Sequence, residues 1–224
     1  MATSGTTSFN LDFDDIIEEA YERCGLELRT GYDLLTARRS LNLMFLEWAN
    51  RGLNLWTIEQ RSLSLTAGTA SYNLTADTVN IMSAVLRTGS GDTQQDVTLD
   101  RISQNEYLHV PDKLKQARPS QYFLQRTATP VLFLYPAPDA ETSYTFQYYV
   151  IRRIEEVGAF TNTADVVFRF LPALVAGLAY HLSLKKAPDR VPLLKSLYEE
   201  EFARAAIEDR DTASVYLTPE ISVG

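Results

Sequence analysis

The sequence has 224 residues, of which 45% are hydrophobic and 22% charged, as in a globular protein with one compact domain or two small ones. The formal net charge of −8 argues against broad DNA binding, because proteins that grip phosphates normally carry a basic surplus. Cys24 is the only cysteine, which excludes an intramolecular disulfide and a metal site built from several thiolates. The N-terminal stretch lacks a basic start and an apolar core, so we expect function without export.

The chain is predicted to begin with a short arm and an amphipathic helix. Residues 1–10 are mostly small and polar, and we expect a flexible arm there. Asp12 can cap the helix that follows, and Gly25 can end it. The apolar stripe of this helix has helical spacing and consists of Phe13, Ile16, Ile17, Ala20 and Cys24.

A second helix is predicted from about Asp33 to Gly52. Leu35 and Leu46 lie on a flank of it, so we expect more than one side of this helix to be covered. Its main stripe consists of Leu34, Ala37, Leu41, Phe45 and Trp48.

The pattern changes to strands after Trp56. Leu63 and Leu65 alternate with polar residues, a period of two that indicates a β-strand. Between two later strands, the segment PAPDAET is rich in turn-forming residues and predicts a hairpin. The predicted strand segments are RSLSLTAG, NIMSAVLRTG, DVTLDRI, SQYFLQR, VLFLYP and SYTFQYYVIRRI, with a short helix or turn in SQNEYLHVPDKL.

Two further helices are predicted near the C-terminus. The first contains residues 168–186, and the second starts near Asp189 as N-cap, with Pro192 in its first turn. The stripe of the second consists of Leu194, Leu197, Tyr198, Phe202 and Ala205. Residues 212–224 form an extended tail without a helical stripe.

This order of elements predicts an α+β fold, in which helices segregate from a mainly antiparallel β module. We expect residues 11–55 and 164–211 to form one helical bundle, because neither terminal pair of helices can bury its stripe alone. Residues 56–163 then form the β module inserted between the two pairs.

The segment FRFLPALVAGLAYHLSLKK, residues 168–186, resembles a membrane span in length and hydropathy. Arg169, Pro172 and His181 interrupt it, and a central charge costs about 3 kcal/mol on insertion scales. On a helix its large residues line one side and its small ones the other, which favours a buried helix with neighbours on two sides. The large side comprises Val167, Leu171, Leu174, Leu178 and Leu182, and the small side comprises Arg169, Ala173, Ala176, Tyr180 and Ser183.

One of those neighbours could be a second subunit. We expect Leu174 and Leu178 to point inward and the small side to meet another helix. Trp and Tyr are common anchors of protein interfaces, which adds Trp56, at the junction between helices and strands, to the candidates. The candidate subunit-interface residues are Arg169, Ala173, Ala176, Tyr180 and Trp56.

The sequence carries no recognisable catalytic or cofactor motif. A nucleophile elbow, a P-loop ending in Lys-Ser/Thr and an HExxH zinc motif are all lacking. We interpret His109 and His181 as structural residues, and the carboxylate pairs on the predicted helices as solvated faces. We therefore expect neither catalysis nor a cofactor or metal.

Several stretches together resemble the head-to-tail adaptor proteins of short-tailed tailed bacteriophages. They occur in the same order and extend over most of the chain, roughly residues 12–219. The stretches are EWANRGLNLWTIEQRSLSLTAGTASYNL, DTVNIMSAVLRTGSG, ARPSQYFLQR and FRFLPALVAGLAYHL.

The resemblance implies a virion structural protein at the tail vertex, assembled in the host cytoplasm. Such adaptors form a ring, typically of twelve copies, below the portal protein. The ring extends the DNA channel, passes genomic DNA without sequence-specific binding and carries tail or nozzle proteins. The C-terminal tail could bind the portal as an added strand, with Val215, Leu217, Ile221 and Val223 as its candidate contacts.

Two other interpretations stay open at this point. A tail-completion or baseplate component would share the same build and differ only in its place in the virion. An enzyme or ligand-binding protein on an α+β scaffold would need a pocket with convergent polar groups, for which the sequence offers no candidate.

Overall fold

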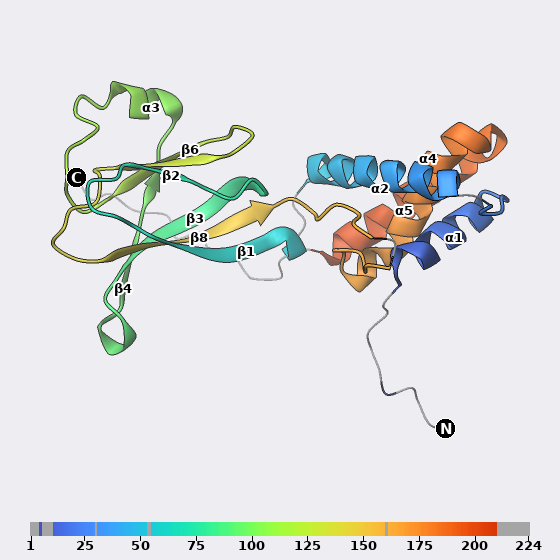
Figure 1. Cartoon of the computed structure of the whole chain (residues 1–224), viewed down its shortest axis with the longest axis horizontal. Coiled ribbons are helices and arrows are strands. Elements are labelled where there is room, and N and C mark those ends of the chain that lie inside the picture. The colour runs from blue at the N-terminus through green and yellow to red at the C-terminus, as the bar shows by residue number, and fades with distance from the viewer. Residues whose placement is uncertain (1–4, 6–10, 30, 53–54, 160, 210–224) are drawn as a thin grey trace, which may run out of the picture. The chain divides into compact units, whose positions relative to one another are not determined.

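A computed structural model describes residues 5, 11–29, 31–52, 55–159 and 161–209 (Figure 1). The chain forms two compact units. The helical unit comprises Met1–Glu47 and Glu156–Gly224, and the β unit comprises Trp48–Glu155. Helices and mainly antiparallel sheets are thus segregated, which confirms the predicted α+β fold.

Among the described residues, the helical unit contains four α-helices: α1 (Phe13–Arg23), most of α2 (Gly31–Arg51), α4 (Leu171–Lys186) and α5 (Val191–Glu208). The Asp12 side chain caps α1 by accepting a 3.0 Å hydrogen bond from the Asp15 N–H. The helix ends at Arg23 with Cys24 as C-cap, and the next residue, Gly25, has a φ of 68°, a backbone conformation that favours glycine. Short 3₁₀ turns precede the last two helices, η3 (Phe168–Phe170) before α4 and η4 (Pro188–Arg190) before α5.

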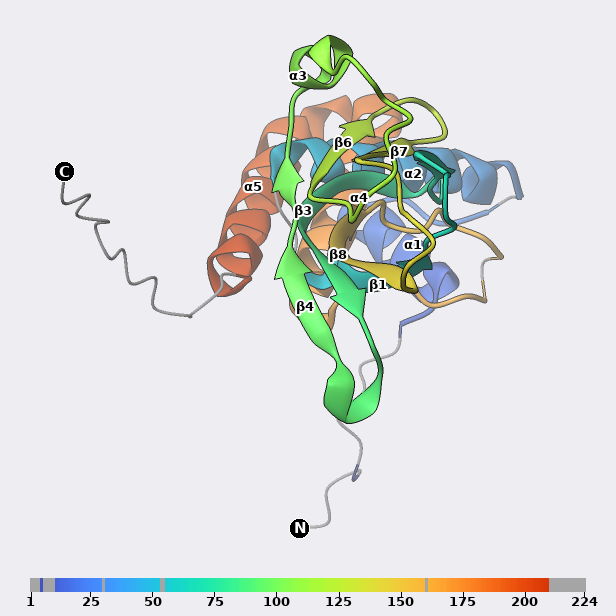
Figure 2. The same cartoon turned by 90° about the vertical axis from the view of Figure 1, so that its left-hand side faces the viewer.

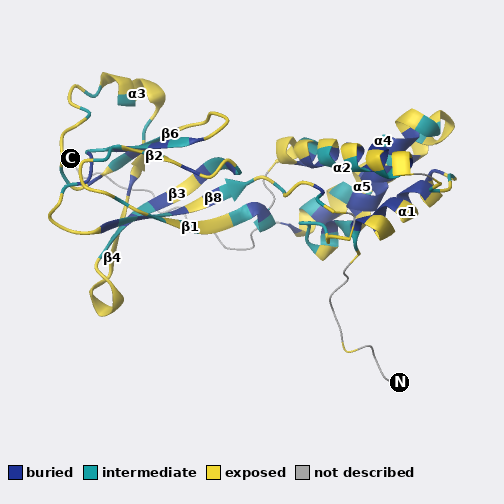
Figure 3. Ribbon diagram, viewed as in Figure 1, coloured by how far each residue is buried: buried dark blue, intermediate teal, exposed yellow. Residues whose placement is uncertain are grey.

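Helix α4 is the centre of the helical unit, and dark blue covers most of its length in Figure 3. Gly177 allows two neighbours to approach, because an added Cβ would lie 2.4 Å from Met44 Sδ of α2 and 2.7 Å from Tyr198 Cε2 of α5. On the α1 side, the Cys24 thiol donates to the Ala179 carbonyl at 3.2 Å. A single helix therefore buries its surface against three others of the same chain.

Polar contacts at the C-terminal end of α4 attach it to α2. The Lys185 ammonium donates to Ser40 Oγ at 2.8 Å, and Lys186 forms an ion pair with Asp33. This hydrogen-bonded ion pair raises the pKa of Lys186, so the ammonium stays charged at neutral pH.

In the described part of the β unit, two four-stranded sheets are ordered β1-β8-β3-β4 and β2-β7-β6-β5. All pairs are antiparallel except the short β5–β6 pair. Figure 2 shows β3 and β4 running side by side as a hairpin. The strands are β1 (Ile58–Ser64), β2 (Ser71–Asn73), β3 (Thr78–Thr88), β4 (Gln95–Thr98), β5 (Asp100–Arg101), β6 (Gln121–Gln125), β7 (Val131–Tyr135) and β8 (Tyr144–Arg152).

A shared hydrophobic core lies between the two sheets. Along β8, the buried side chains are Tyr144, Phe146, Tyr148 and Val150, the alternation that the sequence shows. Tyr122 of β6 meets Phe146 edge-on, with ring centroids 5.7 Å apart. Leucines of β6 and β7 complete the same cluster.

The short helix α3 (Gln104–His109) packs on the second sheet. Its Tyr107 ring lies 5.8 Å from Phe123 and 5.2 Å from Phe133, centroid to centroid. A capping box fixes its start, because Ser103 Oγ accepts from the Glu106 N–H while the Glu106 carboxylate accepts from the Ser103 N–H.

The predicted hairpin across PAPDAET is wrong. β7 and β8 belong to different sheets, and β7 forms its hairpin with β6 instead. The reason is packing: Leu132 and Leu134 of β7 bury their side chains in the same core as Phe146, so the chain crosses from one sheet to the other. Asp189 is also not the N-cap of α5, since it lies inside η4 and Arg190 takes the cap position.

Candidate interaction surfaces

The small side of α4 meets another helix of the same chain. Ala173 and Ala176 are buried, and the Tyr180 ring stacks on Tyr198 of α5 with centroids 5.9 Å apart. Leu174 and Leu178 are fully buried as well. In this chain the two alanines therefore have no surface left to offer a second subunit, and the small residues serve close packing of α4 against α5.

Arg169 and Trp56 are partly exposed. Arg169 forms an ion pair with Asp209, whose side chain is almost completely buried, so the guanidinium neutralises a carboxylate at the end of α5. Trp56 lies in the 3₁₀ turn η1 (Leu55–Thr57) of the β unit. A role of Arg169, Tyr180 or Trp56 in subunit contacts stays a prediction. The predicted portal contacts lie outside the described residues, as does most of the N-terminal arm, and also stay a prediction; they are Val215, Leu217, Ile221 and Val223.

The outward side of α2 is an exposed apolar stripe. The expectation that the flank with Leu35 and Leu46 is covered is wrong for the described chain, because Leu35 is 53% exposed and Leu46 is 56% exposed. We call this surface the α2 stripe. Its exposed members follow each other at steps of three and four residues and are Tyr32, Leu35, Arg39, Leu43 and Leu46.

Positive charge flanks the α2 stripe. Arg38 and Arg39 lie in the middle of the helix, and residues 34–46 contain no acidic side chain. No carboxylate of the described ranges pairs with either arginine, and Arg39 Nε donates only to the Leu35 carbonyl. Partial desolvation lowers the pKa of Lys185, and the nearby Arg39 guanidinium lowers it further, which places a third cation at this surface.

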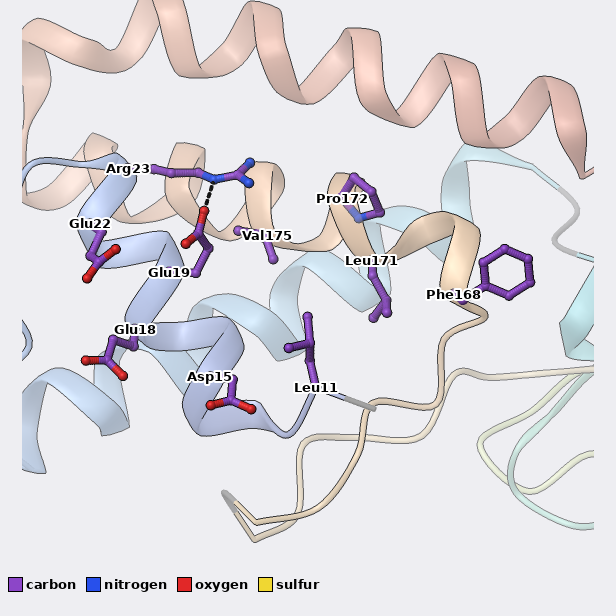
Figure 4. A pocket seen from close by; sticks show the side chains of 10 residues that line it. All are labelled: Leu11, Asp15, Glu18, Glu19, Glu22, Arg23, Phe168, Leu171, Pro172 and Val175. Atoms are coloured by element: carbon purple, nitrogen blue, oxygen red, sulfur yellow. Dashed lines mark hydrogen bonds and ion pairs between the residues drawn. The ribbon is translucent and has the colours of Figure 1, made fainter. Parts of the chain in front are cut away.

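A hollow of about 670 Å³ with an acidic edge lies between α1 and α4 (Figure 4). We call it the α1–α4 groove. Its apolar part includes Phe168, which is 65% exposed, and its acidic part comes from one side of α1. The lining residues are Leu11, Asp15, Glu18, Glu19, Glu22, Arg23, Phe168, Leu171, Pro172 and Val175.

The charge of the groove is largely unneutralised. Arg23 pairs with Glu19 at 2.8 Å, whereas Asp15, Glu18 and Glu22 have no cationic partner among the described residues. The sequence correctly indicated solvated carboxylates on this helix. It did not reveal that η3 and α4 bring an apolar floor beside them, because those residues are some 150 positions away.

Each histidine lies within hydrogen-bonding distance of a neighbouring oxygen. His109 Nδ1 lies 2.6 Å from the Asn105 carbonyl within α3, and His181 lies 3.1 Å from a Glu47 carboxylate oxygen against the Tyr180 ring. Within the described ranges no group of three or more His, Cys, Asp or Glu side chains could hold a metal ion. In the same ranges no helix combines the length and hydropathy needed to cross a membrane.

Comparison with known proteins identifies the family. A family model described as SU10 adaptor protein matches residues 11–221, nearly the whole chain. The chain belongs to the SU10 adaptor protein family. SU10 adaptors are a phage head-to-tail adaptor family, so this SU10 adaptor is a phage structural protein. Among curated proteins no match was found.

Proposed function

We propose that this SU10 adaptor forms a ring below the portal at the tail vertex of the virion. The ring extends the DNA channel and provides a platform for tail or nozzle proteins. The adaptors that this sequence resembles typically form rings of twelve copies, and we propose the same number here. The observation that carries the proposal is the family match over residues 11–221. Assembly then takes place in the host cytoplasm before the ring becomes part of the virion.

The surfaces of the helical unit support a ring. A closed ring of identical copies needs two different patches that meet around a rotation axis, rather than one patch that pairs with itself. The α2 stripe and the α1–α4 groove share no residue and differ in charge. The partly exposed Trp56 and Tyr180 are further proposed contacts between copies.

The charge of the chain suits a conduit for DNA. With a net charge of −8, the protein repels the phosphate backbone, so genomic DNA passes without being retained. We expect no measurable binding of duplex DNA at physiological salt in a fluorescence anisotropy titration. Submicromolar affinity would contradict this part of the proposal.

The proposal is tested by co-assembly with the portal protein of the same phage. Purified adaptor and portal are mixed and separated by sedimentation, and the mass of the portal peak is measured with and without adaptor. We expect adaptor to co-sediment with the portal at a fixed, multiple-copy stoichiometry. Adaptor that stays at the top of the gradient beside an intact portal would contradict the proposal, whereas co-sedimentation only with tail proteins would favour a tail-completion component.

A further inference from the structure

We propose that the α2 stripe of one copy docks in the α1–α4 groove of the next copy around the ring. This inference rests on the proposed function, because it names the contact by which the proposed ring closes. It commits to a second copy of this chain as the occupant of both surfaces.

Charge complementarity is the first argument. The groove presents Asp15, Glu18 and Glu22 without cationic partners in the described chain. The α2 stripe contains Arg39 and is flanked by Arg38, and neither arginine has an acidic partner in those ranges. Each surface therefore carries the charges that the other lacks, and pairing them would relieve like-charge repulsion within each patch.

The apolar parts of the two surfaces also correspond. Leu35, Leu43 and Leu46 project from α2 into solvent, and Phe168 and Leu11 are exposed at the groove. Burial of such side chains is the usual driving force of association, while flanking charges set the register.

The lengths of the two surfaces match. Leu35 to Leu43 rises about 12 Å along α2, and Asp15 to Glu22 rises about 10 Å along α1, at 1.5 Å per residue. About two helical turns of the α2 stripe thus match about two turns of the α1–α4 groove, as when the side-chain ridge of one helix packs into the groove of another.

The two surfaces point away from different sides of the helical unit. On α4, the groove is lined by Leu171, Pro172 and Val175, whereas Gly177 faces Met44 of α2. At about 100° per residue, Gly177 lies about 120–160° around α4 from these three residues. A copy can therefore offer both surfaces at once to two different neighbours, which a head-to-tail ring requires.

Charge reversal with rescue tests the contact on portal-bound protein. We expect Arg38→Glu with Arg39→Glu, or Glu18→Lys with Glu22→Lys, to weaken ring formation on the portal by about ten-fold or more. Combining all four changes in one chain restores opposite charges at every contact, and we expect assembly to return to within about three-fold of wild type. The four side chains are at least partly exposed, and far-UV circular dichroism checks that each variant is folded.

A control of unchanged net charge reverses one cation and one anion elsewhere in the helical unit. Lys195 and Glu208 are exposed on α5 and line neither surface. We expect Lys195→Glu with Glu208→Lys to assemble like wild type. Equal loss of assembly in the control and the test variants would overturn the proposed contact.

Cross-linking distinguishes this contact from its alternatives. With Cys24→Ala as background, Leu43→Cys and Glu18→Cys in one chain should give a ladder of dimers, trimers and larger species on the portal, while either cysteine alone gives none. Dimers from Leu43→Cys alone would indicate a two-fold contact and overturn the proposal. The proposal would also be overturned if the arginine variants lost portal binding but still made the contact between copies. The α2 stripe would then bind the portal and not a second copy.

The same experiments separate this inference from the proposed function. If wild-type protein forms no ring on the portal, the proposed function fails. If wild-type protein forms the ring and the charge and cysteine variants behave like the control, only the docking of the α2 stripe fails.

Discussion

Replacing Gly177 by alanine tests the packing of the helical unit most sharply. The new Cβ would lie 2.4 Å from Met44 Sδ and 2.7 Å from Tyr198 Cε2, both on fully buried side chains. Ordinary carbon contacts begin at about 3.5 Å, so these neighbours must retreat by about 1 Å. Such overpacking costs roughly 2–3 kcal/mol, and the better helix propensity of alanine offsets about 1 kcal/mol of it. We therefore expect the free energy of unfolding to fall by about 1–2 kcal/mol.

The assay is urea unfolding followed by circular dichroism, with Gly31→Ala as control. Gly31 is also helical, but no atom lies within 4 Å of its added Cβ, so that variant should be as stable as wild type or slightly more stable. In a Met44→Ala background the penalty of Gly177→Ala should shrink, because the shorter side chain removes one of the two clashes. If Gly177→Ala were as stable as the Gly31→Ala control, the argument for a close helix approach would be refuted.

Three further predictions concern other parts of the chain. Asp77 accepts two hydrogen bonds from Arg61, which holds the pKa of that carboxyl well below its usual value. Asp77→Asn should therefore cost about 1 kcal/mol at pH 7 after screening by water. The difference from wild type in urea unfolding should begin to shrink below about pH 4, where the unfolded chain takes up its proton, and should decline further as the pH falls toward the lowered pKa of the folded state. An unchanged difference at pH 2 would contradict this. Arg169→Ala should destabilise the chain by about 2–3 kcal/mol, because the buried Asp209 carboxylate loses its ion pair, and a variant with wild-type thermal stability would show that the pair is dispensable. Deleting residues 212–224 should weaken portal binding while the melting temperature stays unchanged, and undiminished co-sedimentation would remove the proposed role of the tail.

Local patterns were sufficient to predict most elements of the fold. The alternation from Tyr144 to Val150 predicted a strand with those side chains buried, and β8 has that arrangement. The cap at Asp12 and the stop at Gly25 are likewise local features, since each acts within one helical turn.

Features that depend on distant partners were not predictable in the same way. The hairpin at PAPDAET failed because turn residues indicate a change of direction but not the sheet to which the next strand belongs. The flank of α2 was expected to be covered because its leucines have helical spacing, which a core and a docking surface share.

The candidate site shows the same limit. The carboxylates of α1 were visible in the sequence as a solvated face, which they are. The groove exists only because Phe168, Leu171 and Pro172 lie beside them after folding. Tyr180 on the small side of α4 was expected to meet another helix, and it stacks on Tyr198, but spacing alone does not say that this helix is α5 of the same chain.

The most direct test of the proposed function is electron microscopy of the adaptor bound to its purified portal. We expect a closed ring of adaptor copies, coaxial with the portal and continuing its channel. Portal particles without added density, imaged at an adaptor concentration far above that of the portal, would contradict the proposed function.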